Sequence, residues 1–79
     1  MKVKELIEKL KKADPEAMVV MSYDSEGNGY NKLRDVETDN QAYCHGEIGF
    51  KKLTPELEKR GYGEGDLLED GEDAVVLWP

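Results

Sequence analysis

The spacing of apolar residues at the start of the chain predicts an amphipathic helix. Val3, Leu6, Ile7 and Leu10 recur at intervals of three and four residues, so they share one helical face. Pro15 disfavours helical geometry at the residue before it, and the helix should therefore end near residue 12 or 13. The chain is expected to begin with a helix that offers one apolar face to the rest of the fold.

Short apolar patterns in the middle of the chain predict strands. Residues 17–23 are apolar on both faces at first, which is typical of a central, buried strand. The loop at 24–29 contains an Asn-Gly pair that favours a tight turn. Residues 33–38 are a weaker strand candidate, and residues 39–40 would turn the chain into a strand at 41–45. Residues 47–51 alternate as in a half-buried strand. These patterns indicate a meander of short antiparallel strands.

The last third of the chain predicts a second helix and a closing strand. Thr54 offers a hydroxyl for the N-cap, and Pro55 suits the first helical position. Gly61 lies where a C-terminal glycine belongs, so a short helix is expected near 54–61. Residues 74–78 form a wholly apolar run, typical of a buried strand that closes a sheet.

Together these elements predict an α+β fold. We expect an N-terminal amphipathic helix packed on a small, mainly antiparallel sheet, with the short second helix and the C-terminal apolar strand completing it. The length of 79 residues leaves little room for a second core, which favours a single small globular domain over residues 1–79.

Charge is spread unevenly along this chain. Its 11 bases and 18 acids give a net charge of −7. Residues 1–12 hold five lysines and two glutamates, a balance of +3, so the remaining residues sum to −10. Acids are densest in residues 64–73, here named the acidic segment, where no base separates Glu64, Asp66, Glu69, Asp70, Glu72 and Asp73.

The acidic segment allows two interpretations. It can steer a basic partner towards the C-terminal half of the chain, or it can be a solvated surface loop whose charges only repel one another. Direct binding to nucleic acid is disfavoured, because phosphate contacts need clustered lysine and arginine.

The apolar segments of the chain are short. No apolar run approaches the roughly 20 residues that a membrane span needs. The basic start also lacks the apolar stretch of a signal peptide, and a single cysteine agrees with a reducing compartment. We therefore expect a cytoplasmic protein without a membrane partner.

Two patterns resemble metal or catalytic sites. Residues 24–35 partly match a calcium loop, but Asn31 and Lys32 depart from it and a plain hairpin loop fits better. Cys44 and His45 cannot build a four-ligand zinc site alone. On a strand their side chains would point to opposite faces, which excludes a nucleophile–base pair and favours a small buried thiol beside an exposed imidazole. We expect no cofactor, no metal and no enzymatic activity.

Aromatic residues suggest a second kind of site. Tyrosines supply rigid contact area for partners or for stacking on bases, although they also pack at the edges of small cores. With the nearest bases they define an alternative ligand-binding set that consists of Tyr23, Tyr30, Arg34, Tyr43, His45 and Lys51.

Two stretches of the chain resemble a known group of proteins. One runs from Val3-Lys4-Glu5-Leu6-Ile7 through Tyr23-Asp24-Ser25-Glu26-Gly27-Asn28, and the other from Leu53-Thr54-Pro55-Glu56-Leu57 through Tyr62-Gly63 to Ala74-Val75-Val76-Leu77-Trp78-Pro79. They resemble small acidic uncharacterised accessory proteins of tailed bacteriophages. The resemblance implies expression in the cytoplasm of an infected host bacterium, where such proteins often bind a host component, frequently one of a defence system. It carries over no functional residue.

Two functions follow as hypotheses. The first is a non-enzymatic binding protein that engages and inhibits a host protein, such as a defence-system protein, through its acidic surface. The alternative is a homo-oligomer that sequesters a small nucleotide-like immune signal with the tyrosines and the few bases, since a chain this small has little volume for a pocket of its own.

Overall fold

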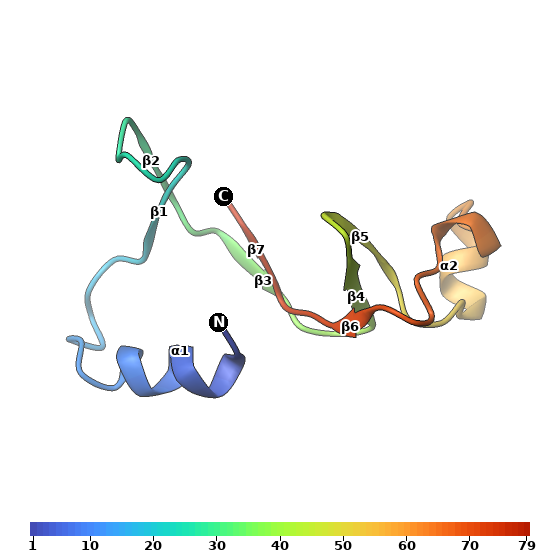
Figure 1. The fold of residues 1–79 in the computed structure, drawn as a ribbon, viewed down its shortest axis with the longest axis horizontal. Coiled ribbons are helices and arrows are strands. Elements are labelled where there is room, and N and C mark those ends of the chain that lie inside the picture. Colours follow the sequence, from blue (N-terminus) through green and yellow to red (C-terminus); the bar gives the residue numbers. More distant parts are fainter. The chain divides into compact units, whose positions relative to one another are not determined.

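The computed structural model describes residues 1–79 and has the predicted α+β class (Figure 1). Contacts between residues divide the chain into two compact units. The terminal unit holds Met1–Asp35 together with Leu77–Pro79, and the middle unit holds Val36–Val76. The expectation of a single domain from chain length stays a prediction.

The first helix of the terminal unit, α1, spans Val3–Leu10. Its last turn carries an ion pair of 2.9 Å between Lys11 Nζ and Glu8 Oε1. The helix is confirmed, but it ends two or three residues earlier than expected and continues as a turn. Its apolar side chains at Val3, Ile7 and Leu10 are about half exposed, and none of its residues is buried.

The strands β1 (Val20–Ser22) and β2 (Tyr30–Lys32) form an antiparallel hairpin in the terminal unit. The prediction of a central, buried strand over residues 17–23 is wrong. The strand is only three residues long, has a neighbour on one edge alone, and leaves Met18 and Val20 more than half exposed. An apolar run is buried only where further strands or a second layer cover it, and a two-stranded hairpin supplies neither.

The middle unit is built on β4 (Gln41–Cys44), which lies between two antiparallel neighbours, β5 (Glu47–Phe50) and β6 (Glu72–Asp73). The short strand β6 lies within the acidic segment and was not predicted. On β4, Ala42 is fully buried and is flanked by Gly49 of β5 and Asp73 of β6. A Cβ on Gly49 would come within 2.8 Å of Leu68 Cγ, so only glycine allows this close approach.

The second helix, α2, spans Pro55–Lys59 and confirms the prediction near 54–61. Thr54 Oγ1 accepts a hydrogen bond of 3.3 Å from the Leu57 N–H, and Gly61 ends the turn with a φ of 97°. Leu57 is the second buried apolar side chain of the middle unit, after Ala42. These two residues form a very small core.

The strands β3 (Asp35–Glu37) and β7 (Val76–Trp78) pair in a separate two-stranded sheet. Next to this sheet the Arg34 N–H donates to the Trp78 carbonyl at 2.9 Å. The C-terminal strand is therefore confirmed, but its predicted burial is wrong, because Trp78 is half exposed and β7 has a single partner strand.

Candidate functional site

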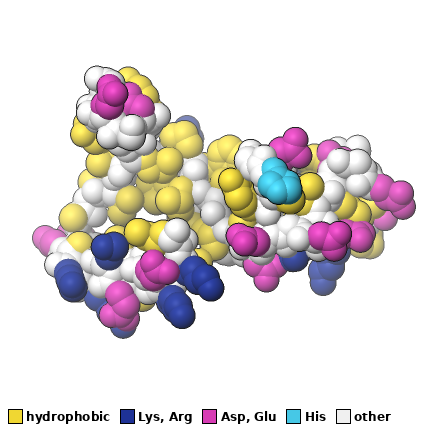
Figure 2. Space-filling model, in the orientation of Figure 1, with side chains coloured by type: hydrophobic (Ala, Val, Ile, Leu, Met, Phe, Trp, Pro, Cys, Tyr) yellow, Lys and Arg dark blue, Asp and Glu magenta, His cyan; other side chains and the backbone are white.

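The two units differ in charge. The terminal unit holds seven bases and seven acids and is neutral, whereas the middle unit holds four bases and eleven acids. The whole net charge of −7 therefore belongs to the middle unit. Figure 2 shows acidic side chains spread over the surface of that unit, and lysines gathered on α1.

Hydrogen bonds and strand pairing hold the acidic segment against the rest of the middle unit. Its first part forms the 3₁₀ helix η1 (Glu64–Asp66), where Asp66 Oδ2 accepts a hydrogen bond of 2.9 Å from the Gly63 N–H. The Leu68 N–H donates to the Phe50 carbonyl at 2.9 Å, and the segment ends in β6 against β4. All six acids of the segment are exposed.

Lys51 ties the second half of the acidic segment together. Its Nζ donates to the carbonyls of Gly71 at 2.7 Å and Glu69 at 3.4 Å, and it lies 3.5 Å from Asp73 Oδ1. This lysine therefore stabilises the acidic surface and is not a free base for an anionic ligand. The carboxylates of Glu64, Glu69, Asp70 and Glu72 form no ion pair and are exposed to solvent.

One row of side chains crosses the sheet of the middle unit. Tyr43 of β4 stands opposite Ile48 of β5 on one side and opposite Glu72 of β6 on the other. Residues directly opposite on antiparallel strands share a face, so these three side chains lie side by side. All three are exposed, with Tyr43 at 47% and Ile48 at 49%. We name Ile48, Tyr43 and Glu72 the cross-strand row.

The cross-strand row could be foreseen only in part from the sequence. Tyr43 and Glu72 appear in the predicted sets, one as a ligand contact and the other as an acid of the surface. Ile48 was missed as a site residue, although the alternation over 47–51 already places it on one face of a strand. The adjacency of Tyr43 and Glu72 depends on β6, which no local pattern marks.

Cys44 and His45 lie in contact, contrary to the prediction that they point to opposite faces. The Cys44 Sγ is 3.4 Å from the His45 Nδ1. Side chains alternate only within a strand, and β4 ends at Cys44. His45 and Gly46 both have positive φ, 47° and 85°, as in a type I′ turn, and this turn brings the imidazole back beside the thiol. No third metal-ligating side chain joins the pair.

In the loop at 24–29, the first carboxylate, that of Asp24, accepts hydrogen bonds from other residues of the loop. Asp24 Oδ1 accepts from the backbone N–H groups of Glu26 at 3.0 Å and Asn28 at 3.1 Å, and Oδ2 accepts from Asn28 Nδ2 at 2.9 Å. The Asn28 backbone N–H, and then its side-chain amide, hold the pKa of Asp24 below its ordinary value. Both oxygens of the first carboxylate of the loop thus already accept hydrogen bonds from N–H donors.

The alternative ligand-binding set is divided between the two units. Its members Tyr23, Tyr30 and Arg34 belong to the terminal unit, and Tyr43, His45 and Lys51 belong to the middle unit.

The two tyrosines of the terminal unit lie close to glycines of their own loop. A Cβ on Gly29 would overlap the Tyr23 ring, whose hydroxyl donates to the Asn28 carbonyl at 3.3 Å. A Cβ on Gly27 would meet the Tyr30 hydroxyl at 2.8 Å. Both rings therefore contribute to the shape of the loop, although each remains more than 60% exposed.

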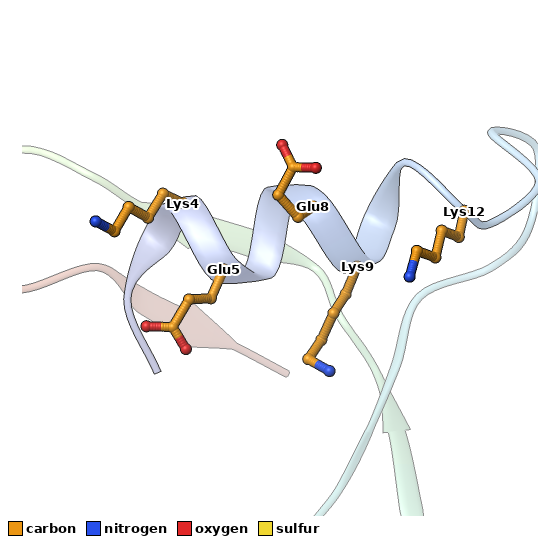
Figure 3. A pocket seen from close by; sticks show the side chains of 5 residues that line it. All are labelled: Lys4, Glu5, Glu8, Lys9 and Lys12. Atoms are coloured by element: carbon orange, nitrogen blue, oxygen red, sulfur yellow. The ribbon is translucent and has the colours of Figure 1, made fainter.

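A hollow on the surface of α1 offers no enclosed site. It is lined only by charged side chains from this helix and the turn after it, as Figure 3 shows for Lys4, Glu5, Glu8, Lys9 and Lys12. A ligand there would stay open to solvent, and the mixed charges favour neither sign strongly. In addition, neither helix of the structure combines the length and the apolar character that crossing a bilayer demands.

Comparison of the chain with models of known protein families, with curated proteins and with solved structures finds no match. The candidate site residues that the geometry supports are the cross-strand row and the unpaired carboxylates of the acidic segment.

Proposed function

We propose that the protein is a non-enzymatic binding module. Its middle unit docks on a basic surface of a partner protein through the cross-strand row and the acidic segment. The resemblance to phage accessory proteins suggests the setting, in which the partner is a component of the host bacterium, such as a defence-system protein, and binding inhibits it in the host cytoplasm.

The cross-strand row carries this proposal. Tyrosine is enriched among the residues that dominate binding energy at protein interfaces, because it buries a large, rigid area and keeps a polar tip. Tyr43 stands between an apolar neighbour, Ile48, and an acidic one, Glu72. This order supports a contact in which an apolar centre is bordered by charge, the usual anatomy of a specific interface.

The charge of the middle unit supports a basic partner. Glu64, Glu69, Asp70 and Glu72 are exposed without a cation, so an incoming arginine or lysine side chain meets carboxylates that form no competing ion pair. A surface of one sign also speeds encounter with a partner of opposite sign, and this effect weakens as salt increases. Capture of the partner should therefore depend strongly on ionic strength.

Two substitutions with the same change of charge test the proposal. Glu72→Lys alters the cross-strand row, whereas Glu58→Lys makes the same change on α2, where Glu58 is exposed and has no ion pair. Partners are captured from bacterial lysate on immobilised protein at low and at high salt. We expect Glu72→Lys and Tyr43→Ala each to weaken capture by about tenfold or more, and Glu58→Lys to leave it unchanged. Equal capture by all variants, or no partner at low salt, contradicts the proposal.

A further inference from the structure

Tyr43 is the tyrosine of the middle unit whose ring has no aromatic or cationic neighbour. The other tyrosine of this unit, Tyr62, meets the Phe50 ring edge-on at a centroid distance of 4.9 Å. The Arg60 guanidinium lies 5.7 Å from the centroid of the same Tyr62 ring. Tyr43 takes part in no such contact and is 47% exposed. One tyrosine thus already has an arginine on its ring, and the other offers an open ring.

Glu72, opposite Tyr43 on the neighbouring strand, has no cation of its own. Its side chain is exposed and forms no ion pair. Glu72 and Asp73 are consecutive in β6, so their side chains point to opposite faces of the sheet. Lys51 pairs with Asp73 and therefore lies towards the face that Glu72 does not share. None of the strands β4, β5 and β6 contributes a base to the face with Tyr43 and Glu72.

These two open groups fit an arginine side chain better than a lysine side chain. A guanidinium is planar, so it can stack on the Tyr43 ring while its edge donates two hydrogen bonds to the Glu72 carboxylate. An ammonium is compact and strongly hydrated, and it cannot form this flat, two-sided contact. The aliphatic stem of the arginine would pack on Ile48, on the other side of Tyr43. Each member of the cross-strand row thus matches one part of an arginine.

We infer that the partner protein places an arginine on the cross-strand row, with its guanidinium stacked on Tyr43 and paired with Glu72. This inference rests on the proposed function, because it names the group of the partner that the same surface binds. The charge of −7 on the middle unit attracts bases of either kind over a distance, and the row selects between them at contact. A partner is therefore distinguished by an exposed arginine and not only by its net charge.

Two peptides of equal length and equal charge test the inference. One repeats Gly-Arg four times and the other repeats Gly-Lys four times, and both have blocked ends. Each peptide is titrated into the unaltered chain labelled with nitrogen-15, and the amide shifts of Tyr43, Ile48 and Glu72 give the dissociation constant. We expect the Gly-Arg peptide to bind about fivefold more tightly, which is the order of gain that stacking on an exposed aromatic ring supplies.

Four variants locate this preference. Tyr43→Phe keeps an aromatic ring and should keep the preference, whereas Tyr43→Leu keeps only an apolar side chain and should lower the ratio to about twofold or less. Glu72→Gln should lower it as well, because an amide offers one oxygen to the two donors of the guanidinium. Glu58→Gln makes the same charge change on α2 and should leave the ratio unchanged. Circular dichroism checks that each variant keeps its fold.

Three results would overturn the inference. The first is equal binding of the two peptides to the unaltered protein, which indicates that the carboxylates attract bases of either kind. The second is a preference that survives in Tyr43→Leu, which places the arginine elsewhere on the protein. The third is the absence of any shift at Tyr43 with the Gly-Arg peptide.

The proposed function can fail or stand separately from this inference. It fails if bacterial lysate yields no partner at low salt, whatever the peptides do. A lysate partner whose capture depends on Glu72, together with equal binding of the two peptides, leaves the binding function standing and removes only the role of arginine.

Discussion

Lys51 Nζ donates a hydrogen bond of 2.7 Å to the carbonyl oxygen of Gly71, twenty residues later in the chain. The same ammonium group reaches the Glu69 carbonyl and the Asp73 carboxylate. A single cation thus holds the second half of the acidic segment in shape. The acids on either side repel one another, and this bond offsets part of that repulsion where the segment turns into β6.

Replacing this lysine should loosen the acidic segment. Lys51→Met keeps most of the apolar stem and removes the donors, so we expect the free energy of unfolding to fall by about 1 kcal/mol, because the site is partly exposed to solvent. Hydrogen exchange at residues 69–73 should also accelerate. Lys52→Met is the matched control, since only backbone atoms of Lys52 form hydrogen bonds. Equal exchange in both variants contradicts the role given to Lys51.

Gly49 should not tolerate a side chain. A Cβ at this position would lie 2.8 Å from the Asp66 carbonyl and from Leu68 Cγ. We expect Gly49→Ala to lower the free energy of unfolding by about 1–3 kcal/mol, because the backbone must shift to admit the methyl group. Gly65→Ala serves as control, since nothing lies within 4 Å of the Cβ there. Chemical denaturation measures the free energy of unfolding of both variants. A Gly49→Ala protein as stable as the Gly65→Ala control would show that the contact of Gly49 with Asp66 and Leu68 is not tight.

His45 occupies a backbone conformation that favours other residues. Its φ of 47° precedes the φ of 85° at Gly46, and asparagine is preferred to histidine at the first position of such a turn. We expect His45→Asn to raise the melting temperature, by an amount equivalent to roughly 0.5 kcal/mol, and His45→Val to lower it, because a branched side chain is strained at positive φ. The prediction fails if the valine variant melts no lower than the asparagine variant.

The loop at 24–29 should loosen in acid. The hydrogen bonds from Asn28 hold the pKa of Asp24 below its ordinary 3.8, so protonation is harder in the folded loop than in the unfolded chain. The stability contributed by this carboxylate is therefore fully present above pH 3.8 and is lost as the pH falls through the lower, folded value. Carboxyl chemical shifts in a pH titration should show the pKa of Asp24 below its ordinary 3.8. The amide shifts of Glu26 and Asn28 should follow Asp24, and in Asp24→Asn they should stay constant over that range.

Local chemistry made part of the fold predictable. The helix at Pro55–Lys59 follows from Thr54, Pro55 and Gly61, because capping depends on residues within one turn of each helix end. The spacing of Val3, Leu6, Ile7 and Leu10 likewise predicted α1, since helical periodicity is a property of a short stretch of chain.

Relationships between distant residues could not be predicted in this way. The strand β6 consists of two acids, which have little tendency to form strands, and it exists because β4 offers it an edge. Apolar runs at residues 17–23 and 74–78 indicate strands but not burial, which depends on what covers them. For the candidate site, Tyr43 and Glu72 were both foreseen as binding residues, but their adjacency depends on a pairing across almost thirty positions.

The pairing of β6 with β4 determines when the proposed docking surface would be assembled. Only two residue pairs, Ala42 with Asp73 and Tyr43 with Glu72, join these strands, whereas four join β4 to β5 through a two-residue turn. The hairpin closes locally and the acidic strand must join it from far along the chain, so β6 should assemble last and detach first. Detachment would separate Glu72 from Tyr43 while the hairpin stays intact. Under the proposed function, the same opening that exposes the edge of β4 would switch off binding, and partner capture would require this strand to be ordered.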